Sequence, residues 1–455
     1  MALTDGVTHV GLPATLELFA ARGLVYFFDY LTLRKSLSHA ISENLRSMSN
    51  TTSPKVIITG AGPAGAVLAF LLSRAGISTT LIERHKDFSR EFRGELLMPS
   101  GLEPLHQIGL WEDFEKVGQV EIERFRIFIN RKPFVTPLVN PAKVAKRSPR
   151  WVSQPQLLEM LVKKAADFPN FTLLRGTRVK NLLQESDHVI GVTTDTHGKL
   201  RSDLVVGCDG RTSIVRAKSG IQAQADTLPM DIVWLKLRCQ PRNVTHSVHF
   251  YIGRGRLVIV APTYDGCVQV GFIIPKGSFK TLRELGTKAL VELITRYLDA
   301  EVAETLLSAD FSDARPFLLS TVADRADEWS CPGMLLLGDA AHTMSPVGGQ
   351  GLNIAIRDAI VAANHLIPAL EKPVDTDGLL AVCQGIERER MNEVVPIQTM
   401  QARGPKIMLN ESIWMRAAFS VAQKIGSGRE IDASFDPNFQ QMLMGVTSVR
   451  WQTEI

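Results

Sequence analysis

The sequence predicts an α/β fold in which a Rossmann-like parallel sheet carries an inserted, mostly antiparallel sheet and is followed by C-terminal helices. Three observations predict it. A short apolar strand, a glycine-rich turn and a helix follow one another between residues 55 and 76, as at the start of a right-handed β-α-β unit. At residues 231–275 apolar and polar residues alternate with a period of two, as in a sheet with one face on a core. Helical spacing of apolar residues dominates residues 352–422.

The glycine-rich turn separates the strand 56–59 from the helix. Gly60 permits the tight turn, Gly62 lets the backbone approach a pyrophosphate, and Gly65 lets the helix lie close to the sheet. Pro63 suits the first helical turn, where its missing N–H is not needed. The second strand ends at Glu83, where a carboxylate accepts hydrogen bonds from ribose hydroxyls. The unit predicts a bound dinucleotide with its phosphates at the helix N-terminus.

Two segments far along the chain indicate which dinucleotide is bound. One apolar strand ends in Asp209-Gly210 and another ends in Gly338-Asp339. A carboxylate at the end of the second of these strands can bind the hydroxyls of a ribityl chain. The glycine-rich loop 346–353 then leads into a helix, whose dipole and backbone amides suit the pyrimidine of an anionic reduced flavin. These segments predict FAD.

These three motifs, in this order, resemble those of the class A flavoprotein monooxygenases, typified by para-hydroxybenzoate hydroxylase and the ubiquinone-biosynthesis hydroxylases. The resemblance covers residues 55–400. It implies that Glu83 binds the adenosine ribose, that Asp339 binds the ribityl chain and that Arg93 lies beside the cofactor. Gln154 occupies a position that is often arginine in the family. The expected cofactor contacts are Gly60, Gly62, Pro63, Ala64, Gly65, Glu83, Arg84, Arg93, Gln154, Asp209, Gly210, Gly338, Asp339, Pro346, Gly348, Gly351, Leu352 and Asn353.

The resemblance also implies a reaction. NAD(P)H reduces the FAD, and one atom of O2 passes, through a flavin C4a-hydroperoxide, to an aromatic, quinone-like or other electron-rich small molecule. No amino-acid nucleophile is expected, and the isoalloxazine ring is expected near Pro346, Gly348 and Gly349. Two alternatives stay open: a FAD-dependent reductase or dehydrogenase on the same fold, and a flavin-binding sensor without turnover.

The composition is that of a globular protein. Apolar residues make up 45% and charged residues 22% of the 455 residues, which indicates neither disorder nor a membrane bundle. Lys and Arg exceed Asp and Glu by 51 − 47 = 4, so a nucleic-acid partner is not indicated. The five cysteines contain no C-x-x-C pair, which argues against a disulfide framework or a metal site and favours a reducing cytoplasm.

The first fifty residues differ from the rest. Residues 12–35 place apolar side chains at near-helical spacing and end in a basic pair, which fits a peripheral membrane anchor and a membrane-associated protein. A helix packed on the body and a segment that is not normally translated are the alternatives. No stretch reaches the roughly 20 apolar residues of a membrane span.

We expect the chain to alternate between two domains. The expected parts are an N-terminal extension 1–50, the FAD-binding domain 51–120, 151–225 and 311–370, the substrate domain 121–150 and 226–310, and a C-terminal helical region 371–455.

Several side chains of the expected substrate domain are candidates for an aromatic site, but half or more of them are expected in ordinary sheet core. They are Trp151, Trp234, Phe250, Tyr251 and Phe272. A local hydrogen-bonding role is favoured for His342 over that of a catalytic base.

Overall fold

The computed structural model describes residues 56–89, 95–139, 147–226, 228–372, 375–409, 412–426, 428–432 and 437–453. All described residues belong to one compact unit, Pro54–Ile455. The expected anchor at residues 12–35 and the contact expected of Arg93 lie outside the described residues. Within the described part, no helix has the length and apolar character to cross a membrane.

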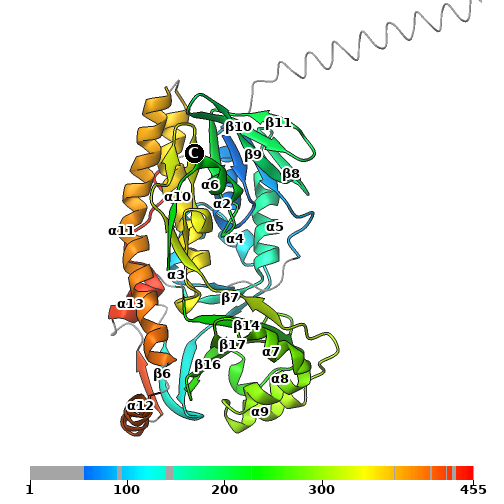
Figure 1. The fold of residues 1–455 in the computed structure, drawn as a ribbon, viewed down its shortest axis with the longest axis vertical. Coiled ribbons are helices and arrows are strands. Elements are labelled where there is room, and N and C mark those ends of the chain that lie inside the picture. The colour runs from blue at the N-terminus through cyan, green and yellow to red at the C-terminus, as the bar shows by residue number, and fades with distance from the viewer. Residues whose placement is uncertain are drawn as a thin grey trace, which may run out of the picture. The chain divides into compact units, whose positions relative to one another are not determined.

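A six-stranded sheet forms the centre of the Rossmann-like half (Figure 1). Neighbouring strands pair in parallel, except that the edge strand β20 is antiparallel to β21. Every residue of β1, β2 and β12 is buried, and burial on both faces explains why β1 and β12 are almost entirely apolar in sequence. In spatial order the strands are β20 (Ser330–Cys331), β21 (Met334–Leu336), β12 (Leu204–Gly207), β1 (Val56–Thr59), β2 (Thr79–Glu83) and β8 (Phe171–Arg175).

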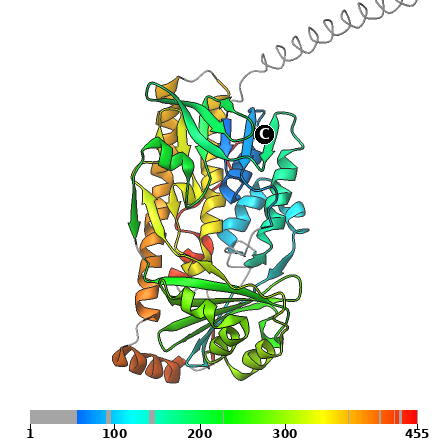
Figure 2. The same ribbon diagram turned by 45° about the vertical axis from the view of Figure 1, so that its right-hand side comes forward.

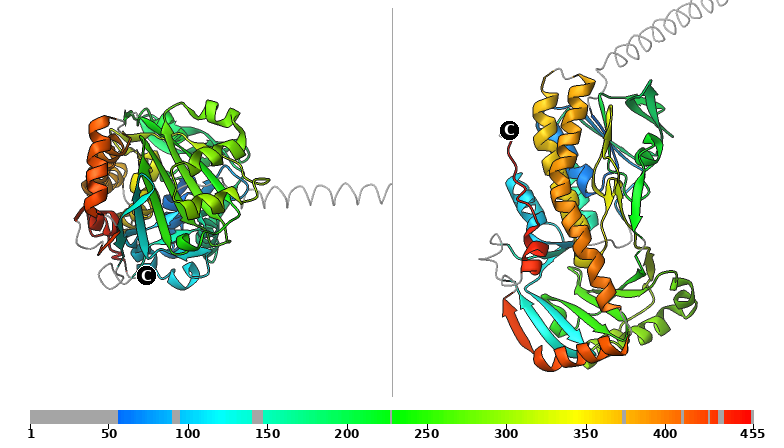
Figure 3. Two further views of the ribbon diagram at one scale, coloured as in Figure 1. Left: turned by 90° about the horizontal axis from the view of Figure 1, so that it is seen from below. Right: turned by 60° about the vertical axis from the view of Figure 1, so that its left-hand side comes forward.

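The predicted β-α-β unit is confirmed, because β1, the glycine turn, α2 and β2 follow in sequence and β1 pairs in parallel with β2. Helix α2 packs against α5 and α10, and α11 runs alongside α10 toward the second sheet (Figures 2 and 3). The helices of this half are α2 (Pro63–Arg74), α3 (Pro99–Gln107), α4 (Trp111–Phe114), α5 (Gln154–Ala165), α6 (Ile214–Ser219), α10 (Gly351–Leu370) and α11 (Thr376–Met408).

The second sheet has eight strands and is mostly antiparallel, as predicted. Among the described strands of this sheet, only β15 with β5 and β6 with β23 pair in parallel. In spatial order the strands are β18 (Phe317–Leu319), β14 (Met230–Leu237), β17 (Val268–Pro275), β16 (Arg256–Pro262), β15 (Ser247–Gly253), β5 (Arg124–Ile129), β6 (Lys132–Leu138) and β23 (Arg429–Asp432). The C-terminal region was expected to be helical, yet it supplies β23. Four residues of mixed polarity carry no strand pattern, and only pairing with β6 makes them one.

The expectation that this sheet buries one face is wrong for its central strands. Helices α7 (Phe279–Glu284), α8 (Gly286–Thr295) and α9 (Ala300–Leu307) cover one face (Figure 1). Val233 and Leu235 of β14 pack in the core on that face, whereas Ile232 and Trp234 belong to a separate apolar cluster. Successive strand residues point to opposite faces, so the second face is buried as well. It forms the wall of the cavity described below.

Three small sheets and several further elements complete the described fold. A small antiparallel sheet of β3 (Leu96–Leu97), β7 (Arg150–Val152) and β4 (Gln119–Glu121) matters most, because its residues reach the cavity. The others are β9 (Val179–Glu185), β10 (His188–Thr194), β11 (Lys199–Arg201), β13 (Ala223–Asp226), β19 (Ala323–Ala326), β22 (His342–Thr343), α12 (Ile413–Gly426), α13 (Pro437–Met444) and the 3-10 turns η2 (Arg242–Val244), η3 (Gly338–Ala340) and η4 (Val347–Gly349).

Candidate active site

A cavity of about 1020 Å³ extends from the carboxyl ends of the parallel strands to the inner face of the eight-stranded sheet. The ends of β1 and β2 and the turns that follow β1, β12 and β21 contribute one half of its lining, and β5, β14, β15, β16, β17 and β18 contribute the other. Ligands of open α/β sheets bind outside the carboxyl ends of the strands. The first half is therefore a candidate cofactor site, and the second is a candidate substrate site.

The glycine turn has one open and two crowded positions. A Cβ on Gly60 would lie 2.5 Å from the Cys208 carbonyl oxygen, and one on Gly65 would lie 2.1 Å from the Gly60 carbonyl oxygen. A Cβ on Gly62 would meet nothing within 4 Å, and Gly62 lines the cavity. Helix α2 begins here without a side-chain cap or an acidic residue in its first turn. The turn therefore leaves space for an anion at the positive end of a helix.

Glu83 closes the turn at the end of β2. Only 3% of the residue is exposed, and its carboxylate accepts hydrogen bonds from the backbone N–H groups of Ala61 and His85, both at 3.0 Å. The His85 ring lies 2.8 Å from the same carboxylate. The next residue, Arg84, is exposed along the cavity. Glu83 thus fixes the conformation of the glycine turn. Glu83 and Arg84 lie where the adenosine of a bound dinucleotide would be expected.

Asp209 is the N-terminal anchor of α6. Its carboxylate accepts hydrogen bonds from the Ser213 hydroxyl at 2.5 Å and from the backbone N–H of Ile214 at 2.7 Å. Burial raises the pKa of Asp209, although these hydrogen bonds oppose the rise. The contacts position the Asp209-Gly210 turn against the cavity.

Asp339 lies at the end of β21 with its side chain 31% exposed. The Nε of Arg211 donates to its carboxylate at 3.2 Å, so the turns after β12 and β21 meet across the cavity. The backbone of Gly338 has φ +59°, which favours glycine, and its N–H donates to Asp358 at 3.0 Å. This geometry leaves the outer part of the Asp339 carboxylate open to a ligand.

The loop after Pro346 turns on two glycines with positive φ, Gly348 at +76° and Gly349 at +63°. Asn353 holds this loop against β3. Its amide donates to the carbonyl oxygens of Gly349 at 2.9 Å and of Leu96 at 3.1 Å, and its oxygen accepts from the Met98 N–H at 2.8 Å. Asn353 itself is fully buried.

Most of the expected site residues come together on the cavity. Its lining includes Gly60, Gly62, Pro63, Ala64, Glu83, Arg84, Gln154, Asp209, Gly210, Gly338, Asp339, Pro346, Gly348, Gly349, Gly351 and Leu352. Gly65 and Asn353 do not line it: the first lies against the turn and the second clamps β3, as described above.

Sequence reasoning missed four charged residues of the lining. Arg178 and Lys180 flank the start of β9, Arg211 follows Gly210 directly, and Glu95 precedes β3. Arg211 had a signal, since it adjoins a recognised motif. Glu95 lies two residues after Arg93, in a segment recognised for its arginine alone. Arg178 and Lys180 had no signal, because no recognised motif includes them.

The substrate half is apolar. Every residue that the eight-stranded sheet contributes to the lining is apolar: Phe125, Ile127, Met230, Ile232, Trp234, Val248, Phe250, Ile252, Leu257, Ile259, Ile273, Phe317, Leu318 and Leu319. Phe439 and Met442 of α13 and Leu409 complete it. The charged residues of the described lining lie in the cofactor half, with the exception of Glu95.

The five aromatic candidates separate by face. Trp151, Trp234 and Phe250 line the cavity. Tyr251 and Phe272 instead pack in the core beneath the helices, where the Tyr251 hydroxyl donates to Asp299 at 2.6 Å. Trp234 fits because it lies opposite Gly271, where a Cβ would come within 2.7 Å of its ring.

Glu95 is a buried carboxyl with few partners. It is 7% exposed, and the indole N–H of Trp151 lies 3.2 Å from its Oε2 and 2.9 Å from Oε1 of Gln269. Burial raises the pKa of Glu95 to about 8, against a lowering by Lys236 and by the Trp151 hydrogen bond. The group is therefore protonated over much of the neutral range.

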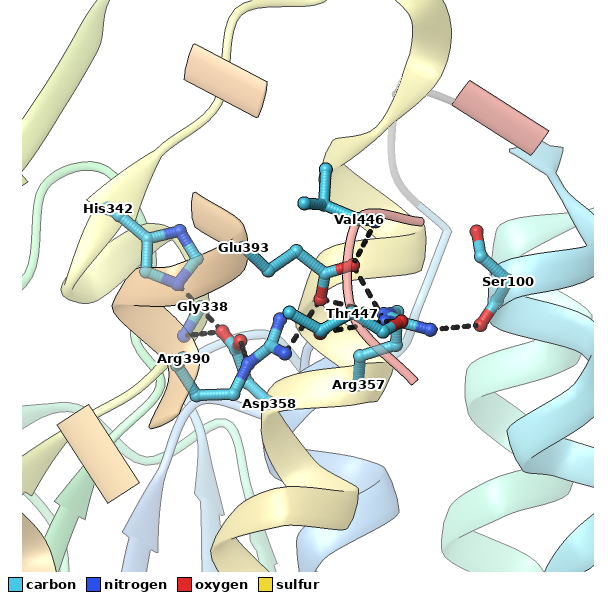
Figure 4. A network of polar contacts seen from close by, with 9 residues as sticks. All are labelled: Ser100, Gly338, His342, Arg357, Asp358, Arg390, Glu393, Val446 and Thr447. Atoms are coloured by element: carbon cyan, nitrogen blue, oxygen red, sulfur yellow. Dashed lines mark hydrogen bonds and ion pairs between the residues drawn. The ribbon is translucent and has the colours of Figure 1, made fainter. Parts of the chain in front are cut away.

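A second set of buried charges lies behind the cofactor half, and each of its charged side chains is ion-paired (Figure 4). Asp358 accepts from Arg390 Nε at 2.7 Å and contacts His342 Nε2 at 2.8 Å. Glu393 accepts from Arg390 Nη1 at 2.7 Å and from Arg357 Nη2 at 2.6 Å. We call these five residues the buried ion network. It joins α10 and α11 to the turn that carries Asp339, and it confirms the structural role favoured for His342.

Comparison with known proteins agrees with this geometry. The model of the family described as FAD binding domain matches residues 53–382. A 6-methylpretetramide 4-monooxygenase from Streptomyces rimosus is 33% identical over 356 residues, which cover 76% of this chain and 83% of that protein. A kynurenine 3-monooxygenase from Stenotrophomonas maltophilia (strain K279a) is 28% identical over 75% of this chain and 77% of its own length.

Solved structures show the same fold. PqsL from P. aeruginosa, in complex with 2-aminobenzoylacetate, superposes with a TM-score of 0.70 at 22% identity, over 81% of this chain and 100% of that one. The p-nitrophenol 4-monooxygenase PnpA from Pseudomonas putida DLL-E4 superposes with a TM-score of 0.69 at 21% identity, over 87% of this chain and 99% of that one. With a family match over most of its length and a relative at 33% identity, this chain belongs to the class A FAD-dependent monooxygenases.

Proposed function

We propose that this enzyme oxygenates a large, mostly apolar, electron-rich molecule of aromatic type. The observation that carries the proposal is the apolar wall of the substrate half. Among the described lining residues of that half there is no cation to bind a substrate carboxylate or phosphate, so a neutral ring system fits it best. The similarity to a 6-methylpretetramide 4-monooxygenase supports the same substrate class.

We propose residue roles for FAD on the same geometry. The open side of Gly62 and the N-terminus of α2 would hold the pyrophosphate, and Glu83 would accept hydrogen bonds from the adenosine ribose. Asp339 would bind the ribityl chain. Gly348 and Gly349 would lie along the isoalloxazine ring. Arg84, Gln154, Arg178, Lys180 and Arg211 line the same half and would contact the remaining polar groups.

We keep the alternating division into FAD-binding and substrate domains as a proposal. Two adjustments make it follow the sheets: β18 and β23 go to the substrate domain, because both pair within the eight-stranded sheet.

The division of labour follows from these roles. FAD supplies the redox chemistry with NAD(P)H and O2 in this family. The chain contributes binding, orientation and exclusion of water. The apolar wall would exclude water from around the reacting atoms. Asn353 holds the loop 346–353 against β3, and this contact would fix the position of β3 relative to the isoalloxazine ring of FAD.

The test is a turnover assay of the full-length, FAD-loaded protein with a panel of two- to four-ring aromatic compounds. Each compound should be offered in a neutral form and as its carboxylate. We expect the neutral forms to accelerate NADH or NADPH oxidation and to give products heavier by one oxygen atom. Acceleration by the carboxylates alone would contradict the proposed substrate class. If NADH or NADPH is oxidised while the substrate is reduced and gains no oxygen atom, the result would point to the reductase alternative.

Peripheral membrane contact through residues 12–35 is a separate proposal, motivated by their apolar spacing alone. Full-length protein should sediment with phospholipid vesicles, and protein without residues 1–47 should not. Equal sedimentation of both forms would contradict it.

A further inference from the structure

Glu95 differs from every other charged residue on the cavity. It is the one charged side chain among the described lining residues outside the cofactor half. It directly precedes β3 of the small sheet, which lies beside the glycine-rich loop 346–353. A buried carboxyl costs stability unless it is paired, so its presence in an apolar wall calls for a reason.

The carboxyl is held in a fixed place. The backbone carbonyl of Glu95 accepts a hydrogen bond from the Val152 N–H at 2.8 Å, which extends the β3–β7 pairing. The Trp151 indole N–H lies between the carboxyl and Gln269. The adjacent Leu96 packs against Gly349, where a Cβ would approach within 3.4 Å. Glu95 is therefore positioned beside the loop at which the reacting ring is proposed to lie.

The charges that act on Glu95 are Lys236 and Asp265, which form an ion pair with each other. Their effects on the carboxyl oppose one another, since Lys236 lowers its pKa and Asp265 raises it. Trp151 and Gln269, which complete its described surroundings, are uncharged. Burial is thus left as the dominant influence, and it brings the pKa to about 8.

A base of that strength suits one kind of proton donor. A phenol hydroxyl has a pKa of about 10, so a carboxylate of ordinary strength is too weak a base by more than five units. The gap to Glu95 is about two units, and efficient general bases have a pKa near the working pH. Enols that belong to extended aromatic systems are donors of the same kind.

We propose that Glu95 is a catalytic base, and that the substrate carries a phenol or enol hydroxyl which binds at its carboxylate. The substrate O–H bond breaks, and the proton forms a new O–H bond on Glu95. The electron pair stays on the substrate oxygen and increases the electron density of the ring carbons that receive the new oxygen atom. This inference rests on the proposed function and adds the hydroxyl group to the substrate class.

A binding experiment on the FAD-loaded protein tests the contact without turnover. The probes are 9-phenanthrol and its O-methyl ether, 9-methoxyphenanthrene, titrated between pH 6 and pH 9 and followed by the flavin absorbance. We expect the phenol to bind at least about tenfold more tightly than the ether above pH 8, because a hydrogen bond to an ionised group contributes 1.5–3 kcal/mol. The preference should decrease as Glu95 becomes protonated below pH 7.

Three variants make the result specific. Glu95→Gln should keep its FAD content and its affinity for the ether, and any preference for the phenol should no longer depend on pH. Glu95→Asp should retain part of the pH dependence. Glu121→Gln removes an exposed carboxylate from the same small sheet, where Glu121 pairs with Arg150, and should behave as wild type.

Turnover of a hydroxylated substrate gives the second readout. We expect kcat/KM of the wild type to rise with pH through about 8, and Glu95→Gln to lose this rise together with about 100-fold in kcat, a typical contribution of a general base. If Glu95→Gln keeps the pH-dependent preference for the phenol, the inference is wrong and the proposed function stands. If wild type binds neither probe, the proposed substrate class fails and this inference fails with it.

Discussion

The buried ion network and Glu95 both contain buried carboxyl groups, but their pKa values are shifted in opposite directions. Asp358 and Glu393 are fully buried, and Glu95 is 7% exposed. Burial by itself would raise the pKa of all three. The contacts with His342 and Arg390 outweigh it for Asp358, and the contacts with Arg390 and Arg357 outweigh it for Glu393, so the pKa of both is lowered. Among the described residues Glu95 contacts no cation, and its pKa is raised to about 8.

This difference in pKa separates a structural set of charges from a carboxyl that is available for proton transfer. Two arginines balance the two acids of the network, and this balance fixes α10 and α11 to the turn that carries Asp339. Removal of either arginine or either acid would leave an uncompensated charge, which makes the network a structural unit. A lone carboxyl stabilises nothing in this way. Its environment instead gives it a proton affinity that is useful for chemistry.

The largest effect is expected from Arg390→Met. The substitution leaves Asp358 and Glu393 buried with part of their positive charge missing, and breaking a buried pair costs about 3–5 kcal/mol. Urea unfolding followed by circular dichroism measures the loss. Arg201→Met is the matched control, because Arg201 pairs with Glu185 on the surface with side chains 56% and 64% exposed. An exposed pair contributes at most about 1 kcal/mol, so equal losses in the two variants would show that the network is not special.

A comparable effect of opposite sign is expected from Glu95→Gln at high pH. The folded-state pKa is raised above the usual 4.5, so the native state binds more protons than the unfolded state between pH 4.5 and pH 8. Stability should therefore fall as pH rises through this window and level off above it. With about 1.4 kcal/mol per unit, the loss is on the order of 3–4 kcal/mol.

The matched measurement compares the unfolding free energies of wild type and Glu95→Gln at pH 5 and pH 8.5. The variant should be the more stable protein at pH 8.5, with little difference at pH 5. Parallel pH dependence of the two proteins would rule out an elevated pKa at Glu95.

Asp339 is intermediate, since it is partly exposed and paired with Arg211 alone among the described residues. Asp339→Ala should weaken FAD binding about 10- to 100-fold, because a hydrogen bond to a charged group contributes 1.5–3 kcal/mol. Fluorescence titration of apoprotein with FAD gives the dissociation constant. Asp310→Ala, which removes an exposed carboxylate away from the cavity, should not change it. An unchanged affinity in Asp339→Ala would contradict the ribityl role.

The smallest effect is expected from Trp151→Phe, which removes the indole donor beside Glu95. That hydrogen bond lowers the pKa of Glu95, so its loss should raise the pKa further, by roughly half a unit to one unit for a bond of about 1 kcal/mol. The midpoint of the pH dependence of kcat/KM reports the shift. Trp329→Phe is the control, because Trp329 is fully buried and its indole N–H has no hydrogen-bond partner among the described residues. If the midpoint moves equally in both variants, the assigned effect of the Trp151 hydrogen bond on Glu95 is wrong.

Much of the cofactor half could be predicted from local sequence patterns. Gly60, Gly62 and Gly65 have local reasons, namely a positive φ, an open side and close helix packing, and such requirements restrict the residue type at single positions. Buried parallel strands likewise appear as continuous apolar runs. For these reasons the β-α-β unit and the two strand ends near Asp209 and Asp339 could be predicted, whereas the individual contacts with FAD stay predictions.

The lining of the substrate half and the two sets of buried charges could not be predicted in this way, because they depend on contacts between distant segments. Alternation along β15 separates Phe250 from Tyr251, but both faces of this sheet are apolar, so the pattern does not say which residue faces the cavity. Likewise, Glu393 lies 36 residues from Arg357, and Glu95 lies 56 residues from Trp151. The burial and the ion-pair partners of a charged residue depend on its tertiary contacts. The residue type of an Asp or Glu in the sequence therefore indicates neither.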